Sequence, residues 1–579
     1  MEFRKHVADV YFPTLSSFSF GPALTSDTFI SPNTKLSGDT WATFLVGALD
    51  SGSVARYTPP QVTLVDYYAG YLQDDFKIRH NLTVNLGLRY EYETPPVEKQ
   101  NMLSGYLDLA NPIPEMQATP PVIPADVKAI ANIPYRYNGA WNFTDSDHRG
   151  MYSNQKTVFM PRAGMALRLN DRTALRVGYA RYVIPPQSVT FLVLGLPTDG
   201  FTASTSAAPV LEGVPQATLS DPFPASNPLI LPLGKSLGRY TNLGGAASWA
   251  QQDMHTGVND RINVSIQRQL PEQVHLDVTY FVNLGHDLPY SLARNMADPQ
   301  LSYTNKANLA RTVANPFYNY LTPTNFPGAL RNQARVTIGS LLVPYPQYGG
   351  LTQTYTSGVL NRYQALQLKV QRPSSKGYSF MVGYSFNRER SYAFFNSDDQ
   401  YAGRFTFQDS DNSRHRFNVA ATYDLPFGRG RTLLSDAHPV VDAVFGGWAA
   451  SWVSFWNSGT FIRFGQLAVS GNPVLANSTK EKWFDTSLFK IAEPYTPRTN
   501  PVQYEGLTGP GRIDANATLS KNFRLTERLR LEFRMEAYNL TNSIMWSNPN
   551  TSVTSTLFGR VTTQANVGRE VQYAARIHF

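Results

Sequence analysis

A histidine and two aspartates near residue 410 have the side-chain types of an acid–base catalyst. His415 follows Asp409 and Asp411 closely in the sequence, and an imidazole beside carboxylates can take up and release protons near neutral pH. The same residues also suit the polar start of a strand, where no catalytic geometry is needed. We favour this second interpretation.

Two further acidic groups have the chemistry of cation or charge-pair sites. Asp145, Asp147 and His148 cluster within residues 142–148, and carboxylate oxygens suit a hard cation such as Ca²⁺. The spacing lacks the glycine and the distal glutamate of an EF-hand loop, so a solvated loop is favoured. Asp74 and Asp75 lie in the middle of an expected strand, where neighbouring side chains face opposite sides. We expect one of the two to face the interior and to pair with a neighbouring arginine.

The chain lacks the motifs of the common enzyme and cofactor sites. It has no GxSxG elbow, no HExxH motif, no Walker loop and no dinucleotide-binding glycine pattern. It also has no cysteine, which excludes disulfides and thiolate metal sites. We therefore predict a protein that is not an enzyme, with no catalytic residue, no cofactor and no metal.

The net charge is +8, from 51 Lys and Arg against 43 Asp and Glu. These charges are spread through turns and alternate strand positions, without a basic cluster or a nucleic-acid motif. We predict no nucleic-acid partner. A surface that attracts acidic ligands or lipopolysaccharide phosphates is an alternative use of the charge.

Aromatic residues are frequent enough to suggest either sugar stacking or membrane-interface girdles. Trp448, Trp452 and Trp456 share one parity, which places them on one face of one strand. Girdle and lipid-facing positions are the simpler interpretation. It extends to the other aromatic residues of this kind, which are Tyr67, Tyr68, Tyr71, Phe455 and Phe461.

The elements that must position these residues are strands, most clearly at the carboxy-terminus. Apolar side chains alternate with charged ones from Leu529 to Ala537, and again with polar ones from Val571 to Phe579. Each strand therefore has one apolar and one polar face. The pattern recurs in hairpins along the chain and ends on an aromatic residue. It indicates an outer-membrane barrel with its apolar face to lipid and its polar face to the lumen.

Connections between the expected strands alternate in length. Tight turns are expected near 79, 171, 272, 375 and 526, with a medium one near 430. Long polar segments are expected at about 13–64, 95–155, 185–259, 287–361, 389–411, 465–511 and 542–568. Short periplasmic turns opposite long external loops are typical of outer-membrane barrels, and the count gives about 14 strands. We predict an all-β, antiparallel transmembrane β-barrel.

The amino-terminus has the character of a strand. Residues 1–12 contain no apolar segment and no small-residue cleavage site, so no secretion signal is expected there. Since an exported barrel needs a signal, we expect Met1 to lie within a longer gene product. Two alternatives stay open: a self-closed porin-like or adhesive barrel, and a soluble secreted β protein. A propeller is disfavoured, because no steady repeat of about 40–50 residues appears.

Several stretches resemble the carboxy-terminal barrel of Oar-like TonB-dependent receptors, a family of large outer-membrane transporters. The resemblance covers nearly the whole chain apart from the long loops. Its longest stretches are YYAGYLQDDFKIRHNLTVNLGLRYEYETPP (67–96), PRAGMALRLNDRTALRVGYARYVIPP (161–186), INVSIQRQLPEQVHLDVTYFVNLGHDLP (262–289), NRYQALQLKVQRPSSKGYSFMVGYSFN (361–387), DNSRHRFNVAATYDLPFGRGR (411–431) and GPGRIDANATLSKNFRLTERLRLEFRMEAYNLTN (509–542).

This resemblance implies a 22-stranded barrel that is filled by an amino-terminal plug and energised through TonB. Residues 1–579 would be its carboxy-terminal portion, without the plug, the TonB box or roughly eight strands. The implied location is the cell outer membrane of a Gram-negative bacterium. The implied partners are outer-membrane lipid and lipopolysaccharide, the barrel-assembly machinery, TonB through the missing part, and an unknown small or oligomeric ligand. Tyr573, Ala575, Ile577 and Phe579 resemble the carboxy-terminal signature that the assembly machinery recognises.

Overall fold

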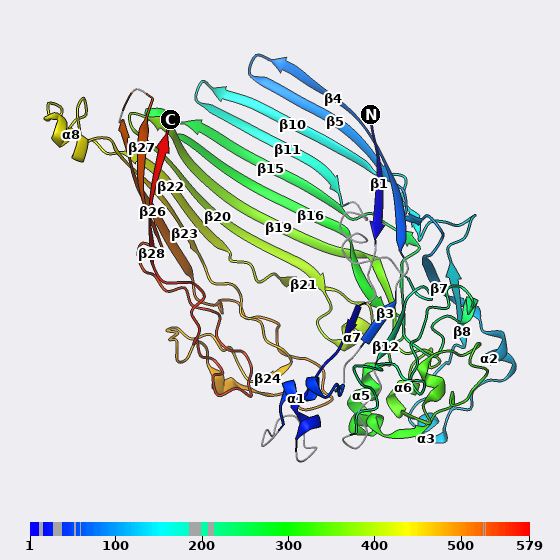
Figure 1. Ribbon diagram of the computed structural model, residues 1–579. Coiled ribbons are helices and arrows are strands. Elements are labelled where there is room, and N and C mark those ends of the chain that lie inside the picture. The colour runs from blue at the N-terminus through cyan, green and yellow to red at the C-terminus, as the bar shows by residue number, and fades with distance from the viewer. Residues whose placement is uncertain are drawn as a thin grey trace.

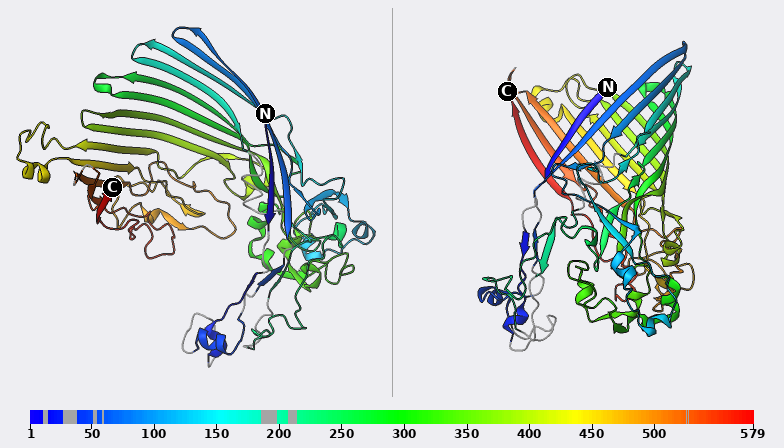
Figure 2. Two further views of the ribbon diagram at one scale, coloured as in Figure 1. Left: turned by 45° about the horizontal axis from the view of Figure 1, so that its top comes forward. Right: turned by 90° about the vertical axis from the view of Figure 1, so that its right-hand side faces the viewer.

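One large antiparallel sheet dominates the protein and curves into an open wall (Figures 1 and 2). The computed structural model describes residues 1–579 except 11–14, 27–37, 51–53, 58–59, 185–197, 207–213, 525 and 527. Within the described residues the sheet has 17 strands, and setting aside the short β6, β13 and β21 leaves 14 long ones. The all-β antiparallel fold and the expected number of strands are therefore confirmed.

The long strands form a meander. Each one pairs with the long strand that precedes it and the one that follows it along the chain. Residues 2–10 form the first of them, as expected. In order they are β1 (Glu2–Val10), β4 (Gln61–Arg79), β5 (Leu82–Glu93), β10 (Phe159–Asn170), β11 (Thr173–Val183), β15 (Val258–Gln269), β16 (His275–Ala293), β19 (Leu351–Ser375), β20 (Tyr378–Ala393), β22 (His415–Asp424), β23 (Trp448–Asn457), β26 (Arg512–Arg524), β27 (Arg530–Tyr538) and β28 (Glu570–His578).

Tight turns join these strands at one end of the sheet, and long segments join them at the other (Figure 1). The turns expected near 79, 171, 272 and 375 are present. In the turn expected near 526, residues 525 and 527 lie outside the described part of the chain. The expected loop at 287–361 is too long at both ends, since β16 extends to Ala293 and β19 begins at Leu351. Pairing continues there through register shifts, one of which lies next to Pro289.

The long segments carry short strands and helices. Their strands are β2 (Leu15–Ser17), β3 (Val54–Tyr57), β6 (Val97–Glu98), β7 (Ser104–Pro112), β8 (Asn138–Phe143), β9 (Ser153–Asn154), β12 (Ala203–Ser206), β13 (Ala247–Ala250), β14 (Asp253–Met254), β17 (Thr312–Ala314), β18 (Arg335–Thr337), β21 (Thr406–Asp409), β24 (Leu467–Val469) and β25 (Phe489–Ile491). Their α-helices are α1 (Thr40–Leu45), α2 (Pro114–Ala118), α3 (Ala125–Lys128), α5 (Pro299–Asn305), α6 (Ile338–Leu341) and α7 (Ser397–Tyr401), whereas α8 (Pro439–Phe445) lies at the end with the turns. No helix in the described ranges is both long and apolar enough to cross a bilayer.

Most of the large buried apolar side chains gather in the long segments. Phe317 and Phe326 are fully buried and stack with ring centroids 5.6 Å apart. A second core forms around Phe464, Phe484 and Phe489. The long strands instead expose many of their large apolar residues, although Val65, Met160 and Leu351 are buried near the outer ends of β4, β10 and β19. The sheet is therefore a wall with two open faces, and the packed cores lie beyond its strand ends.

The wall has two edges. β1 pairs with β4, and β28 pairs with β27. No ladder joins β1 to β28 in the part of the chain that the structure describes, and the views of Figure 2 show these strands at opposite sides of an opening.

Candidate ligand-binding face and external loops

Cross-strand pairing aligns the apolar side chains of neighbouring strands into continuous rows. Val177 lies opposite Val264, which lies opposite Tyr280, and Tyr280 lies opposite Leu366. Val264, Tyr280 and Leu366 are 37%, 46% and 45% exposed. Leu72 on the same face is 79% exposed. A sheet whose large apolar side chains face outward needs a nonpolar medium against them, and a bilayer supplies one. We call this the apolar face.

The opposite face of the wall carries an unbalanced cationic group. The guanidinium carbons of Arg162 and Arg261 lie 5.2 and 4.7 Å from the ring centroid of Tyr182, within the range of cation–π attraction. Arg261 also donates from Nε to Oδ1 of Asn283 at 3.2 Å. Neither arginine forms an ion pair with any carboxylate among the described residues. This polar face therefore offers two guanidinium groups around one ring, a combination that suits an anionic or aromatic ligand group.

Charges at the first three strands of the polar face are compensated. Arg89 donates to Tyr67 Oη at 3.1 Å and lies 3.4 Å from the Glu2 carboxylate. Arg89 also pairs with Glu91, and Arg4 pairs with Glu2. These groups come from β1, β4 and β5, so they tie the first three strands together and leave no net attraction for a ligand.

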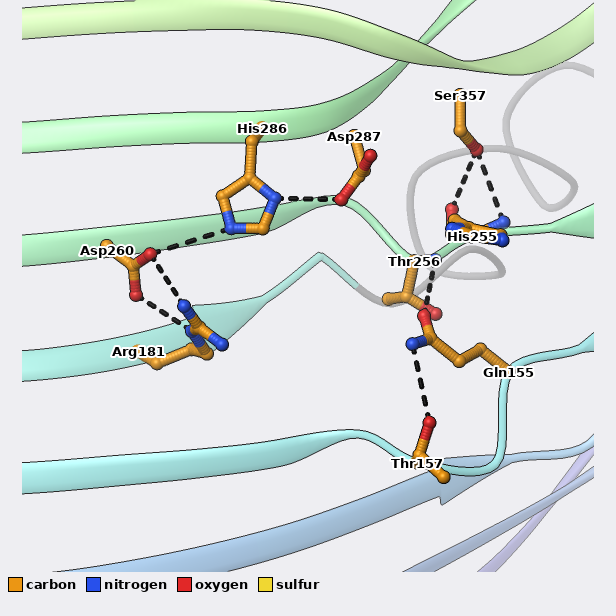
Figure 3. Close-up of polar contacts among 9 residues, drawn as sticks. All are labelled: Gln155, Thr157, Arg181, His255, Thr256, Asp260, His286, Asp287 and Ser357. Atoms are coloured by element: carbon orange, nitrogen blue, oxygen red, sulfur yellow. Dashed lines mark hydrogen bonds and ion pairs between the residues drawn. The ribbon is translucent and has the colours of Figure 1, made fainter.

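A polar cluster fastens the outer ends of β11, β15 and β16 (Figure 3). Arg181 donates to both oxygens of Asp260, at 2.8 and 2.9 Å, and Tyr179 donates to the first oxygen at 2.8 Å. His286 lies 3.5 Å from Asp260 and 2.8 Å from Asp287. The bidentate pair has a fixed geometry, so we assign this cluster to holding the rim.

A neighbouring set of contacts joins the long segments to the same rim (Figure 3). The backbone N–H of Thr256 donates to Gln155 Oε1 at 3.4 Å, and Gln155 donates to Thr157 at 3.5 Å. Ser357 donates to the carbonyl of His255 at 3.0 Å and accepts from its N–H at 3.2 Å. Residues 155–157, 255–256 and 357, which are distant in the sequence, are thereby held together at the rim of the sheet.

The external segments form a folded assembly. The fully buried Phe317, Phe326 and Leu341 pack in one core with Trp141 of β8 and Trp249 of β13. The assembly therefore combines segments from three different long connections. A hollow of about 400 Å³ is lined partly by Leu341 and neighbouring residues of the same core. The fixed core gives these loops a defined surface toward the outside.

A half-buried carboxyl group lies inside this assembly. Asp199 accepts from Ser104 Oγ at 3.1 Å and from Asn242 Nδ2 at 2.7 Å. Burial raises the pKa of this carboxyl above its ordinary value of 3.8, although the two hydrogen bonds oppose the shift. Burial likewise raises the pKa of the Tyr348 hydroxyl. The fold of the loop assembly therefore disfavours the charged forms of Asp199 and Tyr348.

The second external core encloses an arginine. Arg498 donates to the backbone carbonyls of Asn500 at 3.0 Å and Phe464 at 2.6 Å. Burial lowers the pKa of this guanidinium. Since these acceptors are neutral carbonyls, the side chain acts as a structural clamp between two loop segments.

The acidic and histidine residues singled out in the sequence do not form one site. His415 Nδ1 lies 2.8 Å from Tyr384 Oη, while Asp409 pairs with Arg388 at 2.7 Å. Asp411 is exposed. These positions agree with polar groups around a strand start.

Asp145 forms a local turn with its own neighbours. Its carboxylate accepts the backbone N–H groups of Asp147 at 2.9 Å and His148 at 2.6 Å, and these bonds lower the pKa of Asp145. No group of three possible metal ligands occurs within the described ranges.

The prediction that Asp74 or Asp75 pairs with a neighbouring arginine is wrong. Asp75 accepts from Asn85 Nδ2 of the adjacent strand, and Asp74 accepts the backbone N–H of Asp75 at 2.8 Å. By register, Asp75 shares the polar face with Arg89, but Arg89 is already paired with Glu91. Glu91 lies two residues from Arg89 on the same face of β5, so the nearer carboxylate holds this arginine.

The three tryptophans, Tyr68 and the carboxy-terminal strand residues lie on the apolar face. The lipid-facing position expected for Tyr67, Tyr71 and Phe455 is wrong, because the register places them on the polar face opposite Glu93, Arg89 and Asp514. Phe461 is buried in the second external core region. Trp448, Trp452 and Trp456 lie opposite Lys521, Ala517 and Ile513 on a single row, which confirms their common parity. Tyr573, Ala575 and Ile577 of β28 lie opposite Met535, Phe533 and Leu531. Phe579 is fully exposed. The position of these four residues is compatible with an assembly signature, and that role stays a prediction.

Sequence reasoning missed the cation pair around Tyr182 and the cores of the external segments. The arginines occupy polar-face positions on β10 and β15, which is visible from strand alternation, but their convergence on Tyr182 depends on register. For the loops, the signal was the recurrence of large apolar residues between 313 and 342, within a segment expected to be polar.

Comparison with known proteins agrees with this architecture. The family model described as "Outer membrane beta barrel domain" matches residues 1–572. No curated protein matches the chain. Among solved structures, the chain is similar to the ferripyoverdine receptor of Pseudomonas aeruginosa (9% identity, TM-score 0.38, 96% of this chain and 42% of that one). It is also similar to the outer membrane transporter YddB of Escherichia coli (11%, 0.41, 92% and 47%) and to the ferric preacinetobactin receptor BauA of Acinetobacter baumannii (10%, 0.37, 90% and 44%).

The chain thus spans less than half the length of each of these three proteins. The family match covers nearly all of its residues, and the wall has the apolar and polar faces that a membrane barrel requires. The chain belongs to the outer membrane β-barrel domain family, and its place is the outer membrane of a Gram-negative bacterium.

Proposed function

We propose that residues 1–579 are the carboxy-terminal portion of an Oar-like, TonB-dependent receptor. In the complete protein the external loops capture a ligand and the lumen conducts it, while an upstream plug gates the passage and TonB supplies the energy. This function needs no catalytic residue and no cofactor. The observation that carries the proposal is the pair of unpaired sheet edges at β1 and β28.

Unpaired edges are costly inside a bilayer. Each backbone N–H or C=O without a partner in hydrocarbon costs several kcal/mol. β1 pairs only with the part of β4 between Gln61 and Ala69, so residues 70–79 of β4 lack a partner on that side among the described residues. The free edge of β28 extends over its whole length. Further strands between these edges would satisfy both, and a 22-stranded barrel would supply about eight.

The two guanidinium groups around Tyr182 support a ligand-conducting lumen. Tyr182 and Arg261 lie near the outer ends of β11 and β15, where an incoming ligand would first meet the wall. Since two guanidinium groups converge there on one ring, this site would favour ligands with carboxylate, phosphate or chelate oxygens. The fixed loop assembly would present the first contacts outside.

The remaining partners are proposed from the location. The apolar face would contact outer-membrane lipid, and the rim near Arg181 would contact lipopolysaccharide. Tyr573, Ala575, Ile577 and Phe579 would be recognised by the barrel-assembly machinery during insertion.

The alternative is a self-closed, porin-like or adhesive barrel in which β28 pairs directly with β1. The two strands run in opposite directions along the wall, which would permit an antiparallel ladder.

Cysteine cross-linking separates the two cases, because the 579 residues contain no cysteine of their own. Cysteine pairs between Phe3 or Lys5 of β1 and Val571 or Tyr573 of β28 are introduced into the whole protein in outer membranes. Cross-strand neighbours lie within disulfide range. The receptor proposal predicts no β1–β28 cross-link, and a cross-link at any register would establish the self-closed barrel.

Two controls complete this experiment. Phe3→Cys with Tyr68→Cys joins two residues that lie opposite each other, so it must cross-link in either case. The reading frame upstream of Met1 supplies the second control, since the receptor requires an in-frame plug and further strands there.

A further inference from the structure

The connection between β22 and β23 differs from the other turns at its end of the sheet. Residues 425–447 separate these strands, whereas neighbouring hairpins turn at 80–81, 171–172 and 376–377. The connection contains helix α8, which stands apart from the loop assembly at the opposite end of the strands (Figure 1). A longer insertion at a position where a tight turn would suffice calls for a physical explanation.

Helix α8 has one apolar side. At about 100° per residue, Val440, Val441, Val444 and Phe445 fall within an arc of about 140°. Their exposed fractions are 65%, 37%, 54% and 57%. Leu433 and Leu434 in the preceding loop are 48% and 46% exposed. Contiguous exposed apolar side chains of this kind mark an interaction surface.

The polar side of α8 is fastened, so the helix cannot roll over to bury its apolar side. The backbone N–H of Arg429 donates to Asp442 Oδ1 at 2.7 Å, and Arg429 Nε donates to the carbonyl of Ala437 at 2.9 Å. Gly446 packs so closely that a Cβ there would lie 2.2 Å from Asp442 Oδ1. The exposed apolar side is therefore a fixed feature of the fold.

Two contacts place α8 on the apolar face of the wall. Trp448 Nε1 donates to the carbonyl of Val444 at 2.9 Å, and Lys521 Nζ donates to the carbonyl of Asp442 at 3.5 Å. Trp448 and Lys521 lie opposite each other on the apolar face. The Lys521 ammonium also lies 4.9 Å from the ring centroid of Phe523. Tryptophan and lysine at the end of a lipid-facing row are typical of the membrane–water interface.

We propose that α8, together with Leu433 and Leu434, lies in the inner leaflet of the outer membrane as an in-plane anchor at the barrel rim. The tight turns mark the periplasmic side, so the adjoining leaflet is the inner, phospholipid one. The apolar side of α8 is continuous with a surface that already meets hydrocarbon, which argues for lipid as the occupant. This inference depends on the membrane location alone and not on the proposed transport function.

Site-specific fluorescence in vesicles tests the anchor. Phe445→Cys and Val440→Cys are each labelled with an environment-sensitive fluorophore in the whole protein, reconstituted in phosphatidylethanolamine–phosphatidylglycerol vesicles with or without brominated acyl chains. Ala443→Cys, exposed on the other side of the same helix, is the matched control. Leu72→Cys on the apolar face is the lipid-facing standard. An interfacial helix buries its apolar side about 5–10 Å deep, so we expect bromine to quench the labels at 440 and 445 about threefold more than the label at 443.

Aqueous iodide should give the reverse order. Equal bromine quenching at 440, 443 and 445 would overturn the proposal, because α8 would then have no side that preferentially faces lipid. Shielding of 440 and 445 from both quenchers would also overturn it, since a protein would then cover the helix. Heat-dependent gel mobility confirms that each variant is folded, and the two apolar positions provide independent readings.

Discussion

Replacing one side chain of the apolar face by arginine tests whether that face meets hydrocarbon. Val264 is 37% exposed and lies five residues before the end of β15 at Gln269. At about 3.3 Å per residue this is about 17 Å along the strand, or about 13 Å along the membrane normal at a tilt of about 40°. The apolar band of such barrels is about 25 Å tall, so Val264 lies near its middle.

Val264→Arg should therefore destabilise the folded protein by about 2–4 kcal/mol, the cost of a cationic side chain near the bilayer midplane. Asn263→Arg is the matched control, at the same depth but on the polar face, and should change the free energy of unfolding by about 0.5 kcal/mol or less. The assay is urea titration of the protein folded in phospholipid vesicles, followed by heat-dependent gel mobility. A cost for Val264→Arg no larger than that for Asn263→Arg would refute the assignment of the two faces.

Three further predictions concern the loops and the carboxy-terminus. Phe317→Ala empties a fully buried position of the external core and should cost about 3–5 kcal/mol of local stability. Limited proteolysis should then cleave the external segments faster while protection of the strands is unchanged. An unaltered cleavage rate would contradict the existence of this core. The raised pKa of Asp199 means that its stabilising contribution is complete below its ordinary pKa of 3.8 and is lost as pH rises through the raised value. The protection factor for hydrogen exchange near Ser104, which removes the intrinsic pH dependence of exchange, should therefore fall as pH rises, and Asp199→Asn should flatten that fall. Phe579→Ala should lower the amount of folded protein in the outer membrane if the assembly machinery reads this residue, whereas Gln572→Ala on the polar face should not; equal amounts would argue against the signature.

The strands could be predicted from the sequence because their information is local. Alternation from Leu529 to Ala537 needs only the two-residue period of a strand, and the turn at 171–172 needs only its Asp and its polar neighbours. These features gave the fold class, the number of long strands and the side of the sheet with short turns. The ends of β16 and β19 were misjudged, since their pairing passes through bulges that only the partner strand reveals.

The candidate site could be predicted only in part, because its contacts join distant segments. Arg162, Tyr182 and Arg261 each have an ordinary polar-face position, and only strand register brings the two guanidinium groups over one ring. The core around Phe317 combines three loops whose apolar residues follow no helix or strand period. Such cores are determined by long-range packing, for which the local sequence carries little signal.

The most direct test of the account is the environment of alternate residues along one long strand. Single cysteines at 366–369 of β19 are spin-labelled in the reconstituted protein, and their collision rates with oxygen and with a water-soluble nickel chelate are measured. Leu366 and Leu368 should favour oxygen, while Gln367 and Lys369 should favour the chelate, with a period of two residues. If Leu366 and Leu368 are as accessible to the chelate as their neighbours, or are shielded from both reagents, the apolar face does not meet lipid and the account is contradicted.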